Sequence, residues 1–268
     1  MLVNKINPGV DFDTIGQINE GYIQRWKGRH GLDRGQINGE SLSSDTVAAQ
    51  IWTRDEFPKI IQEFGLDDLL NFDEFGLFYE RGMNHSLQKK GQNQHGFKQS
   101  KKRVTISGGA SATGKKYPQL IIGKAKYPFA FRNHFNRTFK FTNQKNAWIN
   151  SPIFNNHLND INLELIKKDK RIGVVIDFCS GHSTINTEYS NITIFYLPPN
   201  ATPLIQSMDA GIIASVKKRY KTEITNKRFY DIITGKDTVI DLYYSCTLIQ
   251  RIWDETTPET IKHCFRKA

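Results

Sequence analysis

The chain has 268 residues, of which 38% are hydrophobic and 24% are charged, and this balance is typical of a globular protein. No apolar stretch approaches the roughly 18 residues that a membrane-spanning helix needs, and residues 1–13 lack the apolar core of a signal peptide. We therefore expect no membrane association and no entry into the secretory pathway. The cysteines, Cys179, Cys246 and Cys264, show no CxxC spacing, which argues against structural zinc and against a disulfide framework.

The net charge of +10 is concentrated in one part of the chain. The segment from Arg81 to Lys145 holds 15 Lys and Arg residues and no Asp or Glu, whereas the remainder holds more acidic than basic residues. Such a segment would attract the phosphate backbone of DNA, although an ordinary solvated basic face is the alternative explanation. The cations that we expect to contact DNA are Lys101, Lys102, Arg103, Lys115, Lys116, Lys124 and Lys126.

Taken in chain order, the hydrophobic spacing predicts both helices and strands. Apolar residues recur at helical spacing in residues 13–30 and again in residues 55–70. The strands predicted after these lie at 69–79, 103–107, 118–123, 171–178 and 191–199. The predicted helices lie at 146–168, 208–225 and 239–253, and a last one starts at Thr256 or Thr257. This order indicates an α/β fold with a mixed sheet flanked by helices.

The segment GASATGKK at 109–116 resembles a phosphate-binding loop. However, Lys116 stands where such a loop has Ser or Thr, and strands rather than a helix surround the segment. We interpret it as a hairpin turn.

Three aspartates occupy positions that a mixed sheet could bring together. Asp73 lies in the first predicted strand, Asp177 ends the buried strand at 171–178, and Asp209 begins the helix after the last strand. The spacing of Asp209 with Ile212 and Val216 predicts that its carboxylate lies on the inward face of that helix. Buried acids are costly unless they are paired or bind a metal, and oxygen ligands favour Mg²⁺ or Mn²⁺. A helix cap or an ion pair is the alternative role for each of them.

Four segments, in order, resemble successive motifs of the pogo/Tigger branch of DDE transposases, to which centromere-binding and Jerky-like proteins are related. They are NFDEFGLFY at 71–79, LIIGKAKYP at 120–128, VVIDFCSGH at 174–182 and LPPNATPLIQSMDAGIIASVKKRY at 197–220. The separation of 32 residues between Asp177 and Asp209 is typical of that branch. The resemblance begins near Gly21, where GYIQRWKGRHGL is similar to the end of the family's N-terminal DNA-binding module, and continues to the C-terminus.

The resemblance implies a ribonuclease-H-like fold in which Asp73, Asp177 and Asp209 hold two divalent ions, Mg²⁺ or Mn²⁺, for cleavage and strand transfer at DNA phosphodiesters. It implies a helical remnant of a helix-turn-helix module with a linker at 1–45, a catalytic domain at 46–225 and a helical C-terminal extension at 226–268. It also implies DNA as partner, a homodimer on transposon ends and a nuclear location. Most of the family's helix-turn-helix region is missing from the sequence, so the chain is either a truncated copy or a fragment of a longer protein.

The sequence departs from the family around the aspartates. Phe178, Ser180 and Gly181 stand where the family usually has Asn, Pro and Ala, while Ser207 and Ala210 stand where it usually has Pro and Gln. Residues next to metal ligands orient those ligands. A domesticated or inactive DNA-binding protein is therefore the alternative function.

The sequence suggests roles for four other residues but does not establish them. His182 is a secondary candidate, either as a metal or phosphate contact or as a capping histidine. Glu74 points to the opposite face of the strand from Asp73 and is expected to be solvated or paired with a lysine. Trp148 is expected to anchor the core rather than to stack on a base, and Lys217 is expected either to touch DNA or to lie on a solvated helix end.

Overall fold

In this computed structural model the described residues are Arg25, Arg29 and residues 45–81, 100–182 and 187–268. The helix predicted at 13–30 lies almost wholly outside them. Residues from Ser43 to Ala268 form one compact unit, and within the described residues no helix is long and apolar enough to cross a membrane.

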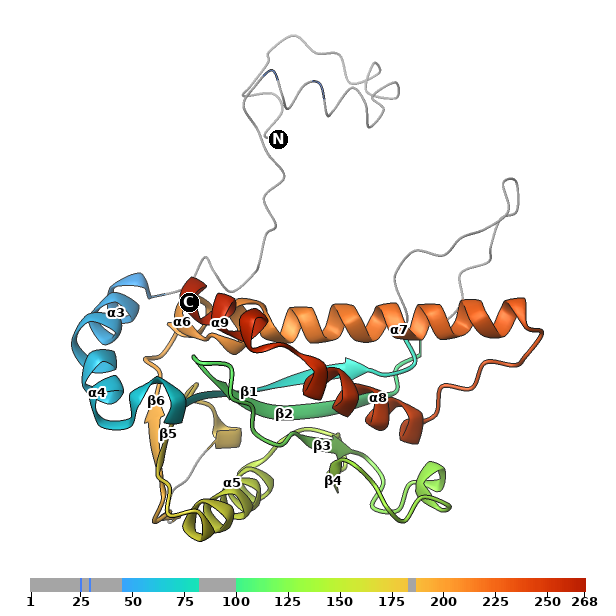
Figure 1. The fold of residues 1–268 in the computed structure, drawn as a ribbon, viewed down its shortest axis with the longest axis horizontal. Coiled ribbons are helices and arrows are strands. Elements are labelled where there is room, and N and C mark those ends of the chain that lie inside the picture. The colour runs from blue at the N-terminus through green and yellow to red at the C-terminus, as the bar shows by residue number, and fades with distance from the viewer. Residues whose placement is uncertain (1–24, 26–28, 30–44, 82–99, 183–186) are drawn as a thin grey trace, which may run out of the picture. The chain divides into compact units, whose positions relative to one another are not determined.

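A mixed sheet forms the centre of this unit, with the strand order β4-β3-β2-β1-β5-β6 (Figure 1). The strands are β1 (Leu69–Phe78), β2 (Arg103–Ser111), β3 (Leu120–Gly123), β4 (Lys140–Asn143), β5 (Ile172–Ile176) and β6 (Ile192–Tyr196). β1, β2 and β3 pair antiparallel, whereas β5 and β6 continue the sheet parallel to β1, and β4 pairs parallel with β3. A central strand with antiparallel neighbours on one side and parallel ones on the other is the ribonuclease-H-like arrangement, so the predicted fold is confirmed.

Helices cover both faces of the sheet (Figure 1). One face carries α7 (Ile213–Ile233), α8 (Leu242–Glu255) and α9 (Pro258–Lys267), while α5 (Ser151–Lys167) covers the other. α3 (Thr46–Ile51), the π-helical turn η3 (Trp52–Glu56) and α4 (Phe57–Asp68) precede β1, and α4 packs against β1 and β5. Side-chain caps start several helices, because Asn150, Asp241 and Thr257 each accept a hydrogen bond from a backbone N–H of the first turn.

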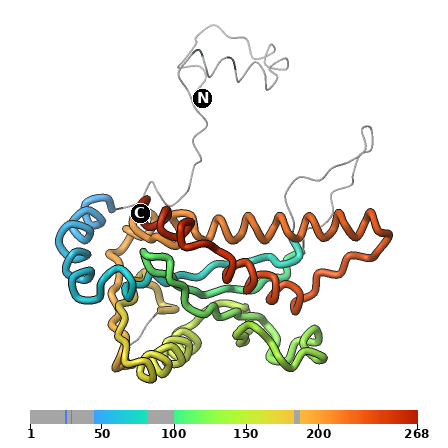
Figure 2. Tube along the Cα trace, in the orientation of Figure 1, coloured from blue at the N-terminus to red at the C-terminus, as the bar shows by residue number. Residues whose placement is uncertain are grey.

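The C-terminal helices share their core with the sheet. α7 crosses the boundary that we expected at 225/226, and α8 packs along it (Figure 2). Trp253 of α8 and Ile261 of α9 are fully buried in the same cluster as Ile106 of β2. Residues 226–268 therefore belong to the same compact unit as the strands.

The alternation of side chains along β1 decides which face each acid occupies. Phe75 and Leu77 belong to the core beneath α7 and α8, whereas Phe72 belongs to the core beneath α5. Because successive strand residues point to opposite faces, Asp73 faces the α7 side and Glu74 faces the α5 side. The prediction that these neighbours point in opposite directions is confirmed.

Two local features differ from the sequence predictions. β4 was not predicted, since its four residues show no strong alternation and are at most partly buried. Trp148, which we expected in the core, is 59% exposed, because α5 begins only at Ser151 and the tryptophan lies on the loop before it.

Candidate active site

Asp73 is an almost buried acid in the middle of the central strand. It is only 9% exposed, and its Oδ1 accepts a hydrogen bond of 2.7 Å from the backbone N–H of Glu74. The residue of β2 that pairs with Asp73 is Gly108, so this strand places no cation opposite the carboxylate. The carboxylate therefore needs compensation from other elements.

Asp177 directly follows β5, the strand beside β1. β1 and β5 pair in parallel, with Asn71 opposite Val175. Asp73 and Asp177 each lie two residues further along the chain. The pairing ends at Asn71 and Val175, and Asp177 lies one residue past the end of β5, where its carboxylate contacts His182.

Asp209 lies in the π-helical turn η6 (Met208–Ile212), which leads into α7. The residue is exposed, whereas the spacing predicted a position on the inward helix face, although its carboxylate still interacts with the buried Asp73. The cause is the irregular turn. Gly211 has a φ of 153°, a conformation that favours glycine, and this breaks the helical spacing between Asp209 and Ile212.

The carboxylates of Asp73 and Asp209 interact electrostatically. Burial, and then the negative charge of Asp209, raise the pKa of Asp73 well above its ordinary value, although a hydrogen bond from Gln206 acts in the opposite direction. The Lys217 ammonium also lies close to both acids. Burial lowers the pKa of Lys217, while Asp209 and Asp73 act to raise it. β1, η6 and α7 thus meet at one charged cluster.

A buried asparagine ties together the backbones that carry all three aspartates. The Nδ2 group of Asn71 donates to the carbonyl of Val175 at 3.0 Å, and its Oδ1 accepts from the backbone N–H of Met208 at 2.8 Å. Asn71 lies two residues before Asp73, Val175 lies two residues before Asp177, and Met208 directly precedes Asp209. One amide therefore links β1, β5 and η6 beside each candidate ligand.

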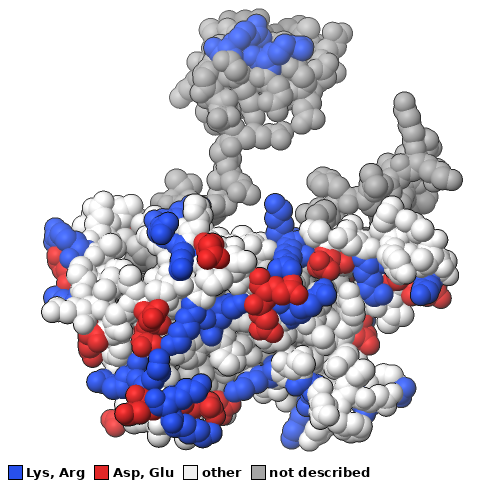
Figure 3. Space-filling view, viewed as in Figure 1, with Lys and Arg blue, Asp and Glu red and all other residues white. Residues whose placement is uncertain are grey.

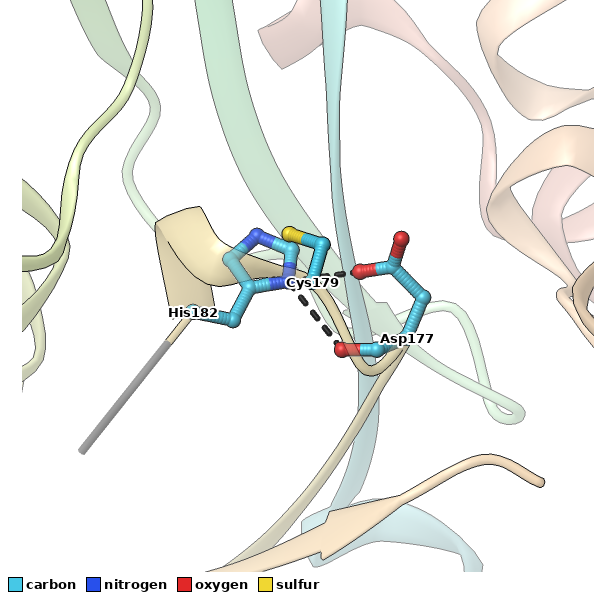
Figure 4. A group of neighbouring side chains, drawn as sticks. All are labelled: Asp177, Cys179 and His182. Carbon is cyan, nitrogen blue, oxygen red and sulfur yellow. Dashed lines mark hydrogen bonds and ion pairs between the residues drawn. The ribbon is translucent and has the colours of Figure 1, made fainter. Parts of the chain in front are cut away.

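His182 forms a second link, on the other face of β1. Its Nε2 lies 2.7 Å from Oε2 of Glu74. Its Nδ1 lies 2.6 Å from Oδ1 of Asp177, a contact that Figure 4 draws as a dashed line. Burial opposes protonation of the ring, but hydrogen bonds with Asp177, Cys179 and Glu74 outweigh it and raise the pKa of His182. Glu74 also accepts from the Ser107 hydroxyl at 3.0 Å. The expectation that Glu74 is solvated or paired with a lysine is therefore wrong.

Among the described residues, Asp177, Cys179 and His182 are the group of potential metal ligands whose ligand atoms all lie within 4.8 Å of one another (Figure 4). One oxygen of Asp177 is directed toward His182, and the other points away from the ring (Figure 4). The sequence suggested His182 through its motif. Glu74 faces the second ring nitrogen of His182, and nothing in the sequence indicated this contact.

Four of the seven cations expected to contact DNA gather around one cavity. Lys101, Lys102, Arg103 and Lys124 line a cavity of about 530 Å³ beside β2 and β3. Lys102 pairs with Glu80 at 2.7 Å. The guanidinium of Arg103 lies 4.9 Å from the ring centre of Trp148 and contributes to the charge around Lys217.

The remaining three cations have different surroundings. Lys126 is exposed, with its ammonium 5.5 Å from the ring centre of Tyr127. Lys115 pairs with Asp68 at 2.6 Å. Lys116 donates to three carbonyls at the end of α8, including that of Trp253 at 2.7 Å. On the face seen in Figure 3, Lys and Arg side chains gather across the centre and lower left, with Asp and Glu side chains among them.

A ribonuclease-H-like sheet with an acid on its central strand, a second after the adjacent parallel strand and a third at the start of a covering helix defines a class of polynucleotide-processing domain. Residues 101–265 match the family described as DDE superfamily endonuclease. The chain belongs to this family, and within it is related to the pogo/Tigger type of transposase.

The curated relatives and a solved structure extend the comparison. The chain is 24% identical to mouse "Tigger transposable element-derived protein 4" over 94% of its own length and 49% of the relative's. It is 29% identical to human "Jerky protein homolog" over 79% of its length and 40% of that protein. The chain thus spans half or less of these two relatives. The structure "Mos1 transposase paired-end complex with left transposon end" aligns with 99% of this chain and 76% of that one, at 13% identity and a TM-score of 0.45.

Proposed function

We propose that the chain carries the active site of a transposase-like endonuclease that cleaves DNA phosphodiesters and transfers the resulting strand. Asp73, Asp177 and Asp209 are its metal ligands in this proposal. The observation that supports it is the buried position of Asp73 on the central strand, with Asp209 close enough to raise its pKa and Asp177 directly after the adjacent strand β5. Mutually repelling carboxylates are stabilised by a divalent cation, which removes the cause of the repulsion.

The donor set fits a hard cation such as Mg²⁺ or Mn²⁺. The aspartates supply oxygen atoms, and Gln206, which hydrogen bonds to Asp73, has a buried Oε1 that lacks a hydrogen-bond partner among the described residues. When bound, two such ions would activate a water molecule or a 3′-hydroxyl and stabilise the charge that develops during in-line attack.

The side chains around the carboxylates have separate tasks in this proposal. His182, held by Glu74, orients the Asp177 carboxylate, and Asn71 holds the three backbones in place. The Lys217 ammonium, beside Asp73 and Asp209, is positioned to bind a phosphate oxygen once a metal neutralises the acids. Mg²⁺ or Mn²⁺ is therefore expected to raise affinity for DNA as well as to support its cleavage.

The alternative is a DNA-binding protein without chemistry. It is favoured by the ion pair between Asp177 and His182, which already engages one oxygen of a required ligand. Phe178, which stands where the family usually has Asn, also removes a polar neighbour of the site. Both functions have DNA as partner and a nuclear location, and the transposase function adds a homodimer on transposon ends.

A nicking assay separates the two functions. Purified protein is incubated with supercoiled plasmid and with duplexes that carry the element's terminal repeats, in Mg²⁺, Mn²⁺ or Ca²⁺. We expect nicking in the first two ions, little in Ca²⁺, and none for Asp177→Asn in any ion. Asp67→Asn, a change at an exposed acid on α4, is the matched control and should nick normally. Wild-type protein that nicks neither substrate in any ion would support the binding protein instead.

Duplex binding tests the shared part of both functions. The dissociation constant should lie at roughly 10⁻⁴ to 10⁻⁶ M at physiological salt and should increase as salt is added. Neutralising Lys101 and Lys124, which line the cavity beside β2 and β3, should reduce both the affinity and its salt dependence. An affinity that does not respond to salt contradicts an interaction with phosphates.

A further inference from the structure

The turn after β5 gathers three side chains that offer different donor atoms. Asp177 follows the strand, and the chain then turns through η5 (Ser180–His182), where the backbone N–H of His182 donates to the carbonyl of Cys179 at 3.1 Å. An oxygen of Asp177, the sulfur of Cys179 and a ring nitrogen of His182 thereby lie within 4.8 Å of one another (Figure 4). A thiolate and an imidazole favour Zn²⁺, whereas carboxylates alone favour harder cations.

Glu74 determines which nitrogen of His182 can bind an ion. Its Oε2 lies 2.7 Å from Nε2, so a hydrogen on Nε2 donates to Glu74 and Nδ1 is left to face Asp177. A carboxylate that accepts from the second nitrogen of a histidine is the common support of a zinc ligand, because it fixes the tautomer and makes the ring more basic. The ring of Phe154, whose centre lies 4.7 Å from that of His182, packs on the imidazole and helps to hold its orientation.

The oxygen and the sulfur are both open to an ion. Oδ1 of Asp177 is buried, and within the described part of the chain no donor other than the imidazole reaches it. Cys179 is exposed, whereas Cys246 and Cys264 are buried, so an ion from solvent reaches this thiol first. Three protein ligands leave a fourth position for water, unlike the closed four-ligand sites that the lack of CxxC spacing argues against.

We propose that Asp177, Cys179 and His182 bind a Zn²⁺ ion, with water as the fourth ligand. On binding, the Cys179 thiol and Nδ1 of the imidazolium each release a proton to solvent, and the ion takes the place of both protons. The other oxygen of Asp177 points away from the ring (Figure 4), so the zinc site is separate from the proposed Mg²⁺ or Mn²⁺ site and shares one ligand with it. Zn²⁺ is thus expected to bind whether or not the protein cleaves DNA.

The test uses Co²⁺ and Zn²⁺ as probes of the purified protein. Co²⁺ bound to a thiolate should give a near-ultraviolet charge-transfer band, and Zn²⁺, which binds such donors more tightly, should abolish it by displacement. Zn²⁺ should also protect Cys179 from alkylation by iodoacetamide, whereas Mg²⁺, which avoids sulfur ligands, should not. Cys179→Ser and His182→Gln should each lose the Co²⁺ band, and Glu74→Gln should weaken Zn²⁺ binding about 10- to 100-fold.

His263→Gln is the matched control, because His263 is exposed and directly precedes Cys264, which makes these two residues the alternative source of a histidine and a thiol. It should retain both the band and the Zn²⁺ affinity. The inference is overturned if Zn²⁺ leaves the alkylation rate of Cys179 unchanged, or if Cys179→Ser, folded by its circular dichroism spectrum, keeps the Co²⁺ band. It is also overturned if Mg²⁺ protects Cys179 as well as Zn²⁺ does, which would mean that ions at the neighbouring carboxylates shield the thiol. None of these measurements requires nicking, so their outcome is independent of the proposed endonuclease activity.

Discussion

Replacing Asn71 with leucine should disable the site through its geometry. The substitution removes the bonds to Val175 and Met208 and leaves one buried carbonyl and one buried N–H without their partner. A net hydrogen bond is worth about 1 kcal/mol, and each orphaned buried group costs roughly 1–3 kcal/mol. We therefore expect a loss of about 2–5 kcal/mol in the free energy of unfolding, which a domain stabilised by about 5–15 kcal/mol survives.

The larger effect should be on activity. A misplacement of about 1 Å in catalytic groups can cost roughly 100-fold in rate, and Asn71 holds the backbone beside each of the three candidate ligands. Asn71→Leu should thus cut Mn²⁺-dependent nicking by about 100-fold at a temperature where the protein is folded. The increase in Tm that Mn²⁺ produces should shrink in parallel, because weaker metal binding stabilises the fold less.

Asn162→Leu provides the matched control for this prediction. Asn162 is also buried, and its Oδ1 accepts from the backbone N–H of Asn191 at 2.9 Å, but it lies on α5, away from the acids. Its replacement should lower Tm by a comparable amount and leave nicking intact. If the two variants are equally stable and equally active, Asn71 does not position the site.

Three further outcomes follow from individual side chains. Because Asp209 repels the buried Asp73, Asp73→Asn should raise the metal-free Tm by about 3 °C, the effect of ~1 kcal/mol in a domain of this size. The gain should vanish below the ordinary pKa of an aspartate, where Asp73 is protonated in both the folded and the unfolded state, and should grow as pH rises from there through the raised pKa. An unchanged or lower Tm at neutral pH counts against the repulsion. Burial lowers the pKa of His157 to about 4, and neither ring nitrogen has a partner among the described residues, so stability should fall by as much as about 3 kcal/mol between pH 6.5 and 4. His157→Leu should flatten this part of the pH profile measured by urea unfolding, and a profile that keeps its slope would refute the assignment. Lys116→Met should lower stability by about 1–3 kcal/mol, because three carbonyls at the end of α8 lose their donor, while DNA affinity stays within twofold or so; a large loss of affinity would instead give Lys116 a direct role in binding.

Hydrophobic periodicity was sufficient to predict most of the fold. All five residues of β5 are buried, and buried residues recur at helical spacing along α5. Such patterns can be predicted from sequence because they depend on the periodicity of a single strand or helix. The order of these elements predicted a mixed α/β sheet, and the family resemblance of the motifs around Asp73, Asp177 and Asp209 implied a ribonuclease-H-like fold. The sequence thus determined which acids are candidates and on which kind of element each one lies.

Tertiary structure decided how those acids are held. Asn71 reaches partners 104 and 137 residues away, and no local pattern marks an asparagine for such contacts. The pairing of Glu74 with His182 depends on a loop that folds back beneath β1, which a strand pattern cannot show. Asp209 is exposed because Gly211 interrupts the helical geometry on which a spacing argument depends.

Exposure also depends on tertiary packing. Tryptophan is a large apolar residue that is usually buried. Trp148 is exposed because α5 begins only at Ser151, which leaves the tryptophan on the preceding loop. Likewise, the segment from Arg81 to Lys145 contains no acids, yet three of its lysines form ion pairs with acids from other parts of the chain. These pairs are Lys102 with Glu80, Lys115 with Asp68, and Lys140 with Asp160. Charge in a sequence is a local property, whereas the potential at a surface sums over every element that reaches it.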